Sequence, residues 1–363
     1  MKLPGEKAST VVFVLLLVLV IVVGIDEKVD KTDIIANLPE SFPEVFPSPT
    51  PTTVPIPSFY EIPMRMHVFQ TFNNCGPATL SMALSYVDLI KSQQELGQIL
   101  RPFQVPGGDN DDKSVTLQEV ADQAEKYGFV SYLRPNGDIE KTKRFIAQGI
   151  PVVTRTWLKA DEDIGHYRII RGYDDSTSQI IQDDSLQGNN LRYSFEEFVE
   201  IWQPFNYEYL VIVPESKKGI VEAILGEELD EKKAWDKARV RIEQELLEKQ
   251  NNIHLLFALS RIYYYLGDYE KSIEYFDRVE SSLSFRTLWY QIEPILALYE
   301  LGDYDRVVQL SGRIIENQNR AFSELYVIRG NIYRKRGNMA LAKEEYEKAV
   351  FYNSGFIDKV PSL

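Results

Sequence analysis

The chain has 363 residues, of which 44% are hydrophobic, and this is enough to bury cores in about two or three domains. Its 54 acidic residues outnumber its 40 lysines and arginines, which gives a net charge of −14. A chain this acidic lacks the clustered basic residues that contact phosphates, so nucleic acid is not an expected partner. The single cysteine, Cys75, excludes an intramolecular disulfide.

Residues 8–25, ASTVVFVLLLVLVIVVGI, form an uncharged stretch of 18 residues that is just long enough to cross a bilayer as a helix. Lysines precede the stretch and acidic residues follow it, which predicts a single-pass protein with a cytoplasmic N-terminus and its remainder outside the cytoplasm. Residues 1–25 are therefore predicted to be a cytoplasmic stub and a transmembrane anchor. The alternative is a cleaved signal peptide, in which case the chain would be secreted.

Residues 26–58 contain no persuasive apolar period and end in PEVFPSPTPTTVPIPSF. Because proline fixes φ and favours extended polyproline II structure, this segment is predicted to be a semi-rigid linker. It would hold the next domain away from the membrane.

Residues 59–214 have the pattern of an α+β domain. Helical spacing or capping signals mark three segments, CGPATLSMALSYVDLI, SVTLQEVADQAEKYGF and IEKTKRFIAQGI. Five β-rich runs follow, and their alternation indicates antiparallel strands: IPVVTRTW, HYRIIRGYD, SQIIQDD, LRYS and EYLVIVP. Helices first and a meander of strands afterwards predict a segregated α+β layout.

Residues 219–356 are predicted to be helical and repetitive. Gly267, Gly302 and Gly337 recur at spacings of 35 residues within similar segments. This period is typical of helix-turn-helix solenoids, and the segments resemble tetratricopeptide repeats. The middle repeat departs from the pattern, for example at Ile295, where a small residue is expected, so its packing is predicted to be offset.

The cysteine lies at the predicted start of a helix, where unpaired backbone N–H groups and the helix dipole lower the pKa of a thiol. A nucleophilic cysteine also needs a base. Of the three histidines, His166 opens a predicted strand, which would hold its ring rigidly. His67 is interpreted as a surface residue before the domain, and His254 falls in the repeats.

Asp184 ends the next predicted strand, 18 residues after His166, and adjacent antiparallel strands would bring the two side chains together. The neighbouring Asp183 is the alternative acid, although strand alternation turns it to the opposite face. Gln70 is the amide expected to donate to an oxyanion near the thiol, with Asn74 as the substitute. One cysteine and three scattered histidines do not make a closed zinc site, and no metal or other cofactor is expected.

The segments QTFNNCGPATLSMAL, GHYRIIRGYDD and IIQDDSLQG resemble the papain-like cysteine peptidases of the bacteriocin-leader (double-glycine) processing family, in its stand-alone branch. The resemblance extends over residues 59–214 and implies a papain-like fold. By position, Cys75 corresponds to the nucleophile and His166 to the base. Gln70 then corresponds to the oxyanion glutamine and Asp184 to the acid that orients the base.

The sequence departs from this family in two ways. Asp184 is followed by Ser185 where the family often has proline. The best-known members are fused to ABC transporters, whose GxxxxGK[ST] motif does not occur in this sequence. The bacteriocin-leader substrate is therefore not implied.

These features predict a membrane-anchored, extracytoplasmic cysteine peptidase that hydrolyses peptide bonds through a Cys–His–Asp triad, while the repeats recruit a substrate or partner protein. Such an arrangement is typical of bacterial surface proteins. Two alternatives stay open: a peptidase fold kept as a catalytically silent binding scaffold, and a papain-like acyltransferase. Neither the peptide specificity nor the choice between hydrolysis and transfer follows from the residues.

Overall fold

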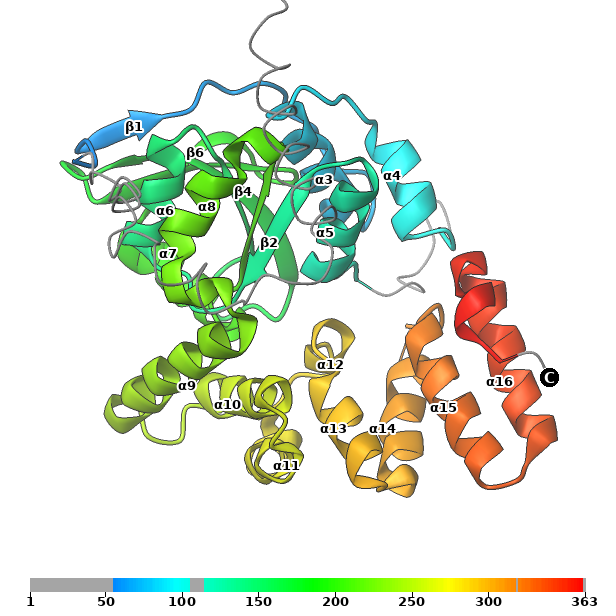
Figure 1. Cartoon of the computed structure of the whole chain (residues 1–363). Coiled ribbons are helices and arrows are strands. Elements are labelled where there is room, and N and C mark those ends of the chain that lie inside the picture. Colours follow the sequence, from blue (N-terminus) through cyan, green and yellow to red (C-terminus); the bar gives the residue numbers. More distant parts are fainter. Residues whose placement is uncertain (1–54, 105–113, 318, 362–363) are drawn as a thin grey trace, which may run out of the picture. The chain divides into compact units, whose positions relative to one another are not determined.

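The computed structural model describes residues 55–104, 114–317 and 319–361. The predicted membrane helix at residues 8–25 and most of the predicted linker lie outside these ranges. Within the ranges, none of the helices combines the length and the apolar character needed to cross a membrane. Residues Val54–Leu363 belong to one unit, drawn in Figure 1.

Up to residue 225, the described chain forms a seven-stranded antiparallel sheet and six α-helices. The strands are β1 (Phe59–Glu61), β2 (Val130–Arg134), β3 (Val152–Trp157), β4 (Gly165–Asp174), β5 (Gln179–Asp184), β6 (Gly188–Ser194) and β7 (Tyr209–Val213). The helices are α3 (Cys75–Ser85), α4 (Gln93–Leu100), α5 (Leu117–Lys126), α6 (Ile139–Ala147), α7 (Phe195–Trp202) and α8 (Lys218–Leu225). The strand order is β2-β7-β3-β4-β5-β6, and β1 pairs with the end of β4.

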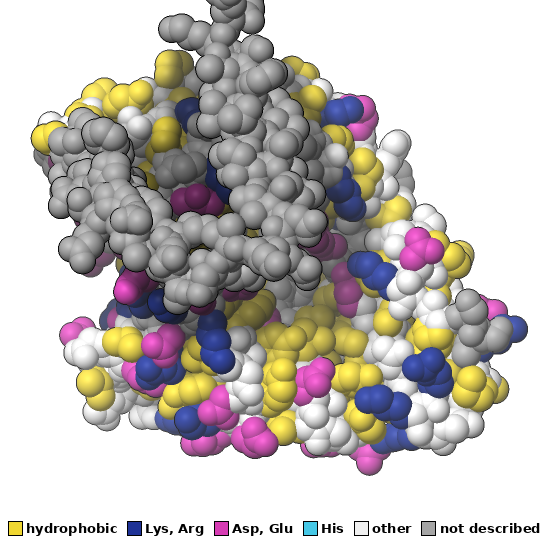
Figure 2. Space-filling model, viewed as in Figure 1, with side chains coloured by type: hydrophobic (Ala, Val, Ile, Leu, Met, Phe, Trp, Pro, Cys, Tyr) yellow, Lys and Arg dark blue, Asp and Glu magenta, His cyan; other side chains and the backbone are white. Residues whose placement is uncertain are grey.

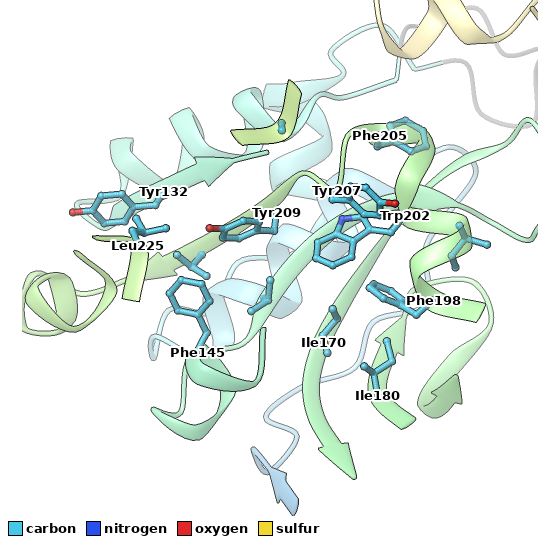
Figure 3. Close-up of a cluster of buried hydrophobic side chains, with 14 of the residues drawn as sticks. Tyr132, Phe145, Ile170, Ile180, Phe198, Trp202, Phe205, Tyr207, Tyr209 and Leu225 are labelled. Carbon is cyan, nitrogen blue, oxygen red and sulfur yellow. The ribbon is translucent and has the colours of Figure 1, made fainter. Parts of the chain in front are cut away.

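Strand β7 shows how the sheet separates two hydrophobic cores. Tyr209, Val211 and Val213 pack with residues of α6, α7 and α8, and Figure 3 shows this core. Leu210 and Ile212 pack on the other side, with residues of α3, α4 and α5. Because successive side chains of a strand point to opposite faces, the sheet is the middle of three layers.

The expectation of an α+β region followed by helical repeats is confirmed. The five predicted strand segments coincide with β3 to β7, although β4 begins one residue and β6 three residues earlier than predicted, and the three predicted helices contain α3, α5 and α6. The predicted order of helices before strands is wrong in two respects. Strand β1 precedes the helices and pairs with β4, and β2 lies between helices and pairs with β7 at the edge of the sheet. Four of its five residues are only partly buried, so the segment shows no clear alternation.

The sequence analysis also missed α4 and α7. Each begins with a capping box, in which a serine caps the helix and a glutamate three residues later bonds back to the backbone of that serine. The pairs are Ser92 with Glu95 and Ser194 with Glu197. The signal that identified α5 was therefore present for both helices.

Eight further helices follow in the described chain, and they form the repeat region. They are α9 (Glu231–Glu248), α10 (Ile253–Leu266), α11 (Tyr269–Asp277), α12 (Thr287–Tyr290), α13 (Glu293–Leu301), α14 (Tyr304–Glu316), α15 (Ser323–Lys335) and α16 (Met339–Tyr352).

The three glycines of the 35-residue period end helices in the repeat region. Gly267, Gly302 and Gly337 have φ values of +82°, +80° and +76°, a backbone conformation that glycine adopts without strain. In each case the next residue is an aspartate or asparagine whose side chain caps the following helix. The glycine and the cap together set each turn. The middle repeat differs because the four-residue α12 precedes a short α13.

The first repeat helices share a core with the sheet. Leu259 of α10 belongs to the same hydrophobic cluster as the β7 residues. Arg261 of α10 is only 3% exposed. It donates hydrogen bonds to Glu208, beside β7, at 3.3 Å and to Glu293 of α13 at 2.6 Å. The predicted boundary between residues 214 and 219 therefore falls within a continuous core.

Ion pairs at the surface contribute much less than this buried cluster. Figure 2 shows basic and acidic side chains interspersed on one face of the described chain. Exposed pairs such as Lys348 with Glu344, at 2.7 Å, contribute little to stability because water screens their charges. Stability at the junction of the two regions should therefore depend on Arg261 and its partners.

Replacing Arg261 with methionine should lower the free energy of unfolding of the chain by about 3–5 kcal/mol, because two buried carboxylates lose their cation. Urea unfolding followed by circular dichroism measures the loss. Arg144 is exposed on α6, and Arg144→Met is the matched control, with an expected change of about 0.5 kcal/mol or less. Two separate transitions, with only the repeats destabilised, would contradict a shared core.

Candidate active site

Cys75 is the first residue of α3, and its side chain is partly exposed while the rest of the helix is buried. Its position places the thiol beside backbone N–H groups that have no partner within the helix. Gly76 follows because a Cβ there would lie only 3.0 Å from the Cβ of Val115. Pro77 is tolerated because the first turn of a helix does not use its N–H.

His166 and Asp184 lie together on adjacent strands. In the antiparallel register of β4 and β5, Arg168 is opposite Asp184, two residues after the histidine. The Nε2 atom of His166 is 2.8 Å from Oδ1 of Asp184, and both side chains are almost fully buried. This contact leaves Nδ1 of the ring available to the thiol.

The environment of the site favours an ion pair between thiolate and imidazolium. Burial by itself would raise the pKa of Cys75. The hydrogen bond and charge of His166, together with the charges of Arg155 and Arg101, outweigh it, so this pKa lies below its usual value. Burial would lower the pKa of His166, but Asp184 and Cys75 raise it above its usual value.

The carboxylate of Asp184 is held from several directions. Its Oδ1 accepts backbone N–H groups of Leu186 at 2.7 Å and Gln187 at 2.8 Å, and its Oδ2 accepts from Arg168. Burial raises the pKa of Asp184, but the bond to His166 and the charges of His166 and Arg168 bring it below its usual value. The residue is therefore an ionised acceptor for the imidazole.

Arg168 was not predicted from the sequence. It is fully buried, and it donates to Thr156 Oγ1 at 3.1 Å and to the carbonyl oxygen of Leu158 at 2.6 Å. These bonds fix the guanidinium that holds Asp184. Its place in the sequence was a usable signal, because residues two apart on a strand share a face and Arg168 follows His166 by two.

Asp183, the alternative acid, has different partners. Its carboxylate accepts from Arg171 at 2.8 Å and from the backbone N–H of Asn190 at 2.9 Å. It is buried in a separate ion pair, away from the imidazole. Asp184 is thus the acid that contacts His166 in the structure.

Gln70 lies in a loop that is tied to the turn after β5. Its backbone N–H donates to the carbonyl of Ser185 at 2.7 Å, and its Oε1 accepts the Ser185 hydroxyl at 2.8 Å. Gln93 of α4 donates to the carbonyl of Phe69 at 2.7 Å and accepts from the N–H of Thr71. No partner within the described ranges takes the NH₂ group of Gln70, so this amide can donate to a substrate.

Asn74, the substitute donor, is committed elsewhere. Its Oδ1 accepts from Arg101 at 2.7 Å, and its Nδ2 donates to Thr71 at 2.7 Å and to Gln104 at 3.3 Å. The residue is only 3% exposed. It organises the loop before α3 and has no NH₂ group left for an oxyanion.

The interpretation of His67 as a surface residue is wrong. Its ring is partly buried, and Nε2 lies 2.9 Å from the carbonyl oxygen of Asp184. It also packs edge-on against Phe69. His67 thus joins the strand end that carries Asp184 to the segment that leads to Gln70. His254 lies away from these residues, against Trp157.

Comparisons with known proteins follow the same division of the chain. Residues 60–210 match the Peptidase_C39 like family. Residues 253–281 and 323–353 match the tetratricopeptide repeat, and the middle repeat lies between these two segments. No curated protein matches the chain closely enough to count as a relative.

Three solved structures illustrate the similarity. A Bacillus anthracis protein assigned as a C39-like peptidase is 16% identical, with a TM-score of 0.37, and the match covers 43% of this chain and 98% of that one. The peptidase domain of Streptococcus ComA, a bifunctional ABC transporter, is 19% identical, with coverages of 42% and 99% and a TM-score of 0.33. MamA is 22% identical, with coverages of 35% and 73% and a TM-score of 0.32.

The chain therefore carries a peptidase C39-like region, which contains the candidate site, followed by a tetratricopeptide-repeat region.

Proposed function

We propose that the protein is a cysteine peptidase that uses Cys75, His166 and Asp184. The observation that carries the proposal is the contact of a buried histidine with an ionised aspartate, beside a helix-start thiol of lowered pKa. A structural cysteine has no need of such a partner. A nucleophile, a base and a third group that orients the base are the arrangement typical of nucleophilic catalysis.

The reaction begins with attack of the Cys75 thiolate on the carbonyl carbon of the scissile peptide bond. The NH₂ group of Gln70 donates to the oxyanion that forms. His166 gives its proton to the departing amine, and the acyl group remains on the sulfur as a thioester. His166 then takes a proton from water as water attacks the thioester, and the thiol is released. Asp184 holds the ring in orientation throughout.

The remaining parts of the proposal come from the sequence pattern and the repeats. Residues 8–25 anchor the chain in the membrane with the peptidase region outside the cytoplasm, or direct its secretion if they are cleaved. The tetratricopeptide repeats bind a protein, which is either the substrate or a partner that brings it. Transfer of the acyl group to an acceptor other than water would use the same thioester.

Cys75 should react with iodoacetamide at pH 6, where a thiol with an ordinary pKa of ~8.5 is almost fully protonated. The rate should fall as the pH drops through the lowered pKa of the thiol. His166→Ala should reduce the rate at pH 6 about tenfold or more, because burial then raises the thiol pKa. The chain has one cysteine, so mass spectrometry of the intact protein measures the reaction directly. Labelling of this variant at the wild-type rate would rule out the pair.

Asp184→Asn should reduce the turnover of a peptide pool about a hundredfold or more, because the imidazole loses the acceptor that fixes its tautomer. Asp183→Asn is the matched control, since it also removes a buried carboxylate from an arginine. It should lower the melting temperature and leave the turnover per folded molecule within a few-fold of wild type. Thermal melts and peptide turnover distinguish the two. Equal losses at both positions would contradict the assignment, and loss at neither would leave a Cys–His dyad.

A further inference from the structure

A cleft of about 280 Å³ lies at the junction of the peptidase region and the repeats. Its walls come from α5 and β3 on one side and from α9, α10, α12 and α13 on the other. The residues that matter here are Arg155, Trp235, Arg261, Tyr290 and Glu293. Because both regions supply its walls, the cleft exists only in the joined structure.

Several polar groups in this cleft are buried without a partner. They include Nε of Arg155 and of Arg261, Nε1 of Trp235 and Oε2 of Glu293, none of which has a hydrogen-bond partner in the described part of the chain. Each of these residues is more than nine-tenths buried. Buried polar groups normally find partners, and leaving one unsatisfied costs about 1–3 kcal/mol. Their gathering in one cleft indicates a place for a polar ligand.

Arg155 differs from three other buried arginines of the described chain. Arg168, Arg171 and Arg261 each form an ion pair with a carboxylate. Arg155 is 3% exposed and has no carboxylate within ion-pair distance among the described residues. It donates to the hydroxyl of Ser114 at 2.9 Å and lies over three aromatic rings. A buried guanidinium that bonds directly to no carboxylate keeps donors that can bind the anionic group of a ligand.

The buried acidic side chains of the cleft make their short contacts with Arg261 and not with Arg155. Glu293 bonds to Arg261 at 2.6 Å, and Glu208 lies 3.3 Å from the same guanidinium. Glu231 lies on the exposed rim, where water screens its charge. Arg155 is therefore the cation of the described cleft walls that forms no direct ion pair, and it interacts with Glu208 only through its charge at longer range.

The cleft lies near the candidate nucleophile, because the charge of Arg155, one of its lining residues, acts on the Cys75 thiol. The Tyr290 ring, 5.1 Å from the Arg155 guanidinium, is so close to Gly165 that a Cβ there would lie 3.2 Å from it. On the other side, Ser114 precedes Val115, the residue that packs against Gly76 beside Cys75.

We propose that the cleft binds the peptide substrate and that Arg155 recognises a carboxylate of this peptide next to the scissile bond. The proposal rests on the proposed peptidase function. The carboxylate is either an Asp or Glu side chain or the C-terminus of the peptide. Arg155 is then a specificity-determining residue, and Tyr290 is the contribution of the repeats to the same subsite.

The test measures how fast the full-length chain cleaves two matched pools of N-acetylated peptides. One pool carries Asp and Glu at its varied positions and the other carries Asn and Gln, both with amidated C-termini. A second arm compares free and amidated C-termini of the neutral pool. Mass spectrometry gives the initial cleavage rates. In one of the two arms, wild type should cleave the peptides that carry the carboxylate about tenfold faster or more than their amide counterparts. This is the effect expected of a hydrogen bond to a charged group.

Arg155→Gln should bring this ratio to about one, and Arg155→Lys should keep part of the preference because it keeps a cation. The ratio is the decisive quantity, because the charge of Arg155 also acts on the thiol, and that effect changes both rates equally. Arg144→Gln is the control and should leave the ratio unchanged. A ratio near one in both arms for wild type, or an unchanged ratio in a folded Arg155→Gln variant, overturns the proposal.

A binding measurement separates this proposal from the peptidase function. If wild type cleaves neither pool, the peptidase function fails. Immobilised Cys75→Ala chain should then still retain the carboxylate peptides about tenfold better than their amides, and adding Arg155→Gln should abolish the difference. Equal retention of the two pools overturns the carboxylate subsite. If Arg155→Gln does not fold in thermal melts, the wild-type ratios and Arg155→Lys decide.

Discussion

The candidate site depends on the turn that follows β5, where one buried carboxylate is bonded on every side. Asp184 takes hydrogen bonds from the imidazole of His166, from Arg168 and from two backbone N–H groups of its own turn. The next residue, Ser185, accepts a hydrogen bond from the backbone N–H of Gln70 and donates one to its side-chain oxygen. A single turn therefore orients the proposed base, His166, and positions the proposed oxyanion donor, Gln70. This arrangement buries the ion pair of Asp184 with Arg168, and losing either partner would leave a buried charge unpaired.

Local patterns were sufficient to find the residues of this turn. Strand alternation selected Asp184 over Asp183, and the structure shows each carboxylate on its own arginine. The helix-start signal located Cys75. The glycine period located the turns of the repeats, because each turn needs a positive φ. In these cases, the physical requirement falls on residues that are close in sequence.

The features that were missed depend on contacts between distant segments. Tyr290 lies over Arg155, and nothing in either local sequence indicates that α12 approaches β3. Repeat proteins usually contact only neighbouring units, so the repeats were expected to form a separate domain. Here Arg261 of α10 is buried against Glu208, and the two residues are 53 positions apart. Such pairings leave no period that a sequence pattern can reveal.

The shared core also affects how the protein is made. The last strand of the sheet ends at Val213, but the hydrophobic cluster on one face of the sheet includes residues of α10, which ends at Leu266. A ribosome adding about 5–20 residues per second needs roughly 3–10 s to complete the segment between them. During that interval the nascent sheet keeps part of an apolar face uncovered. The apolar surface of the emerging chain therefore stays exposed to aggregation until the first repeat folds onto it.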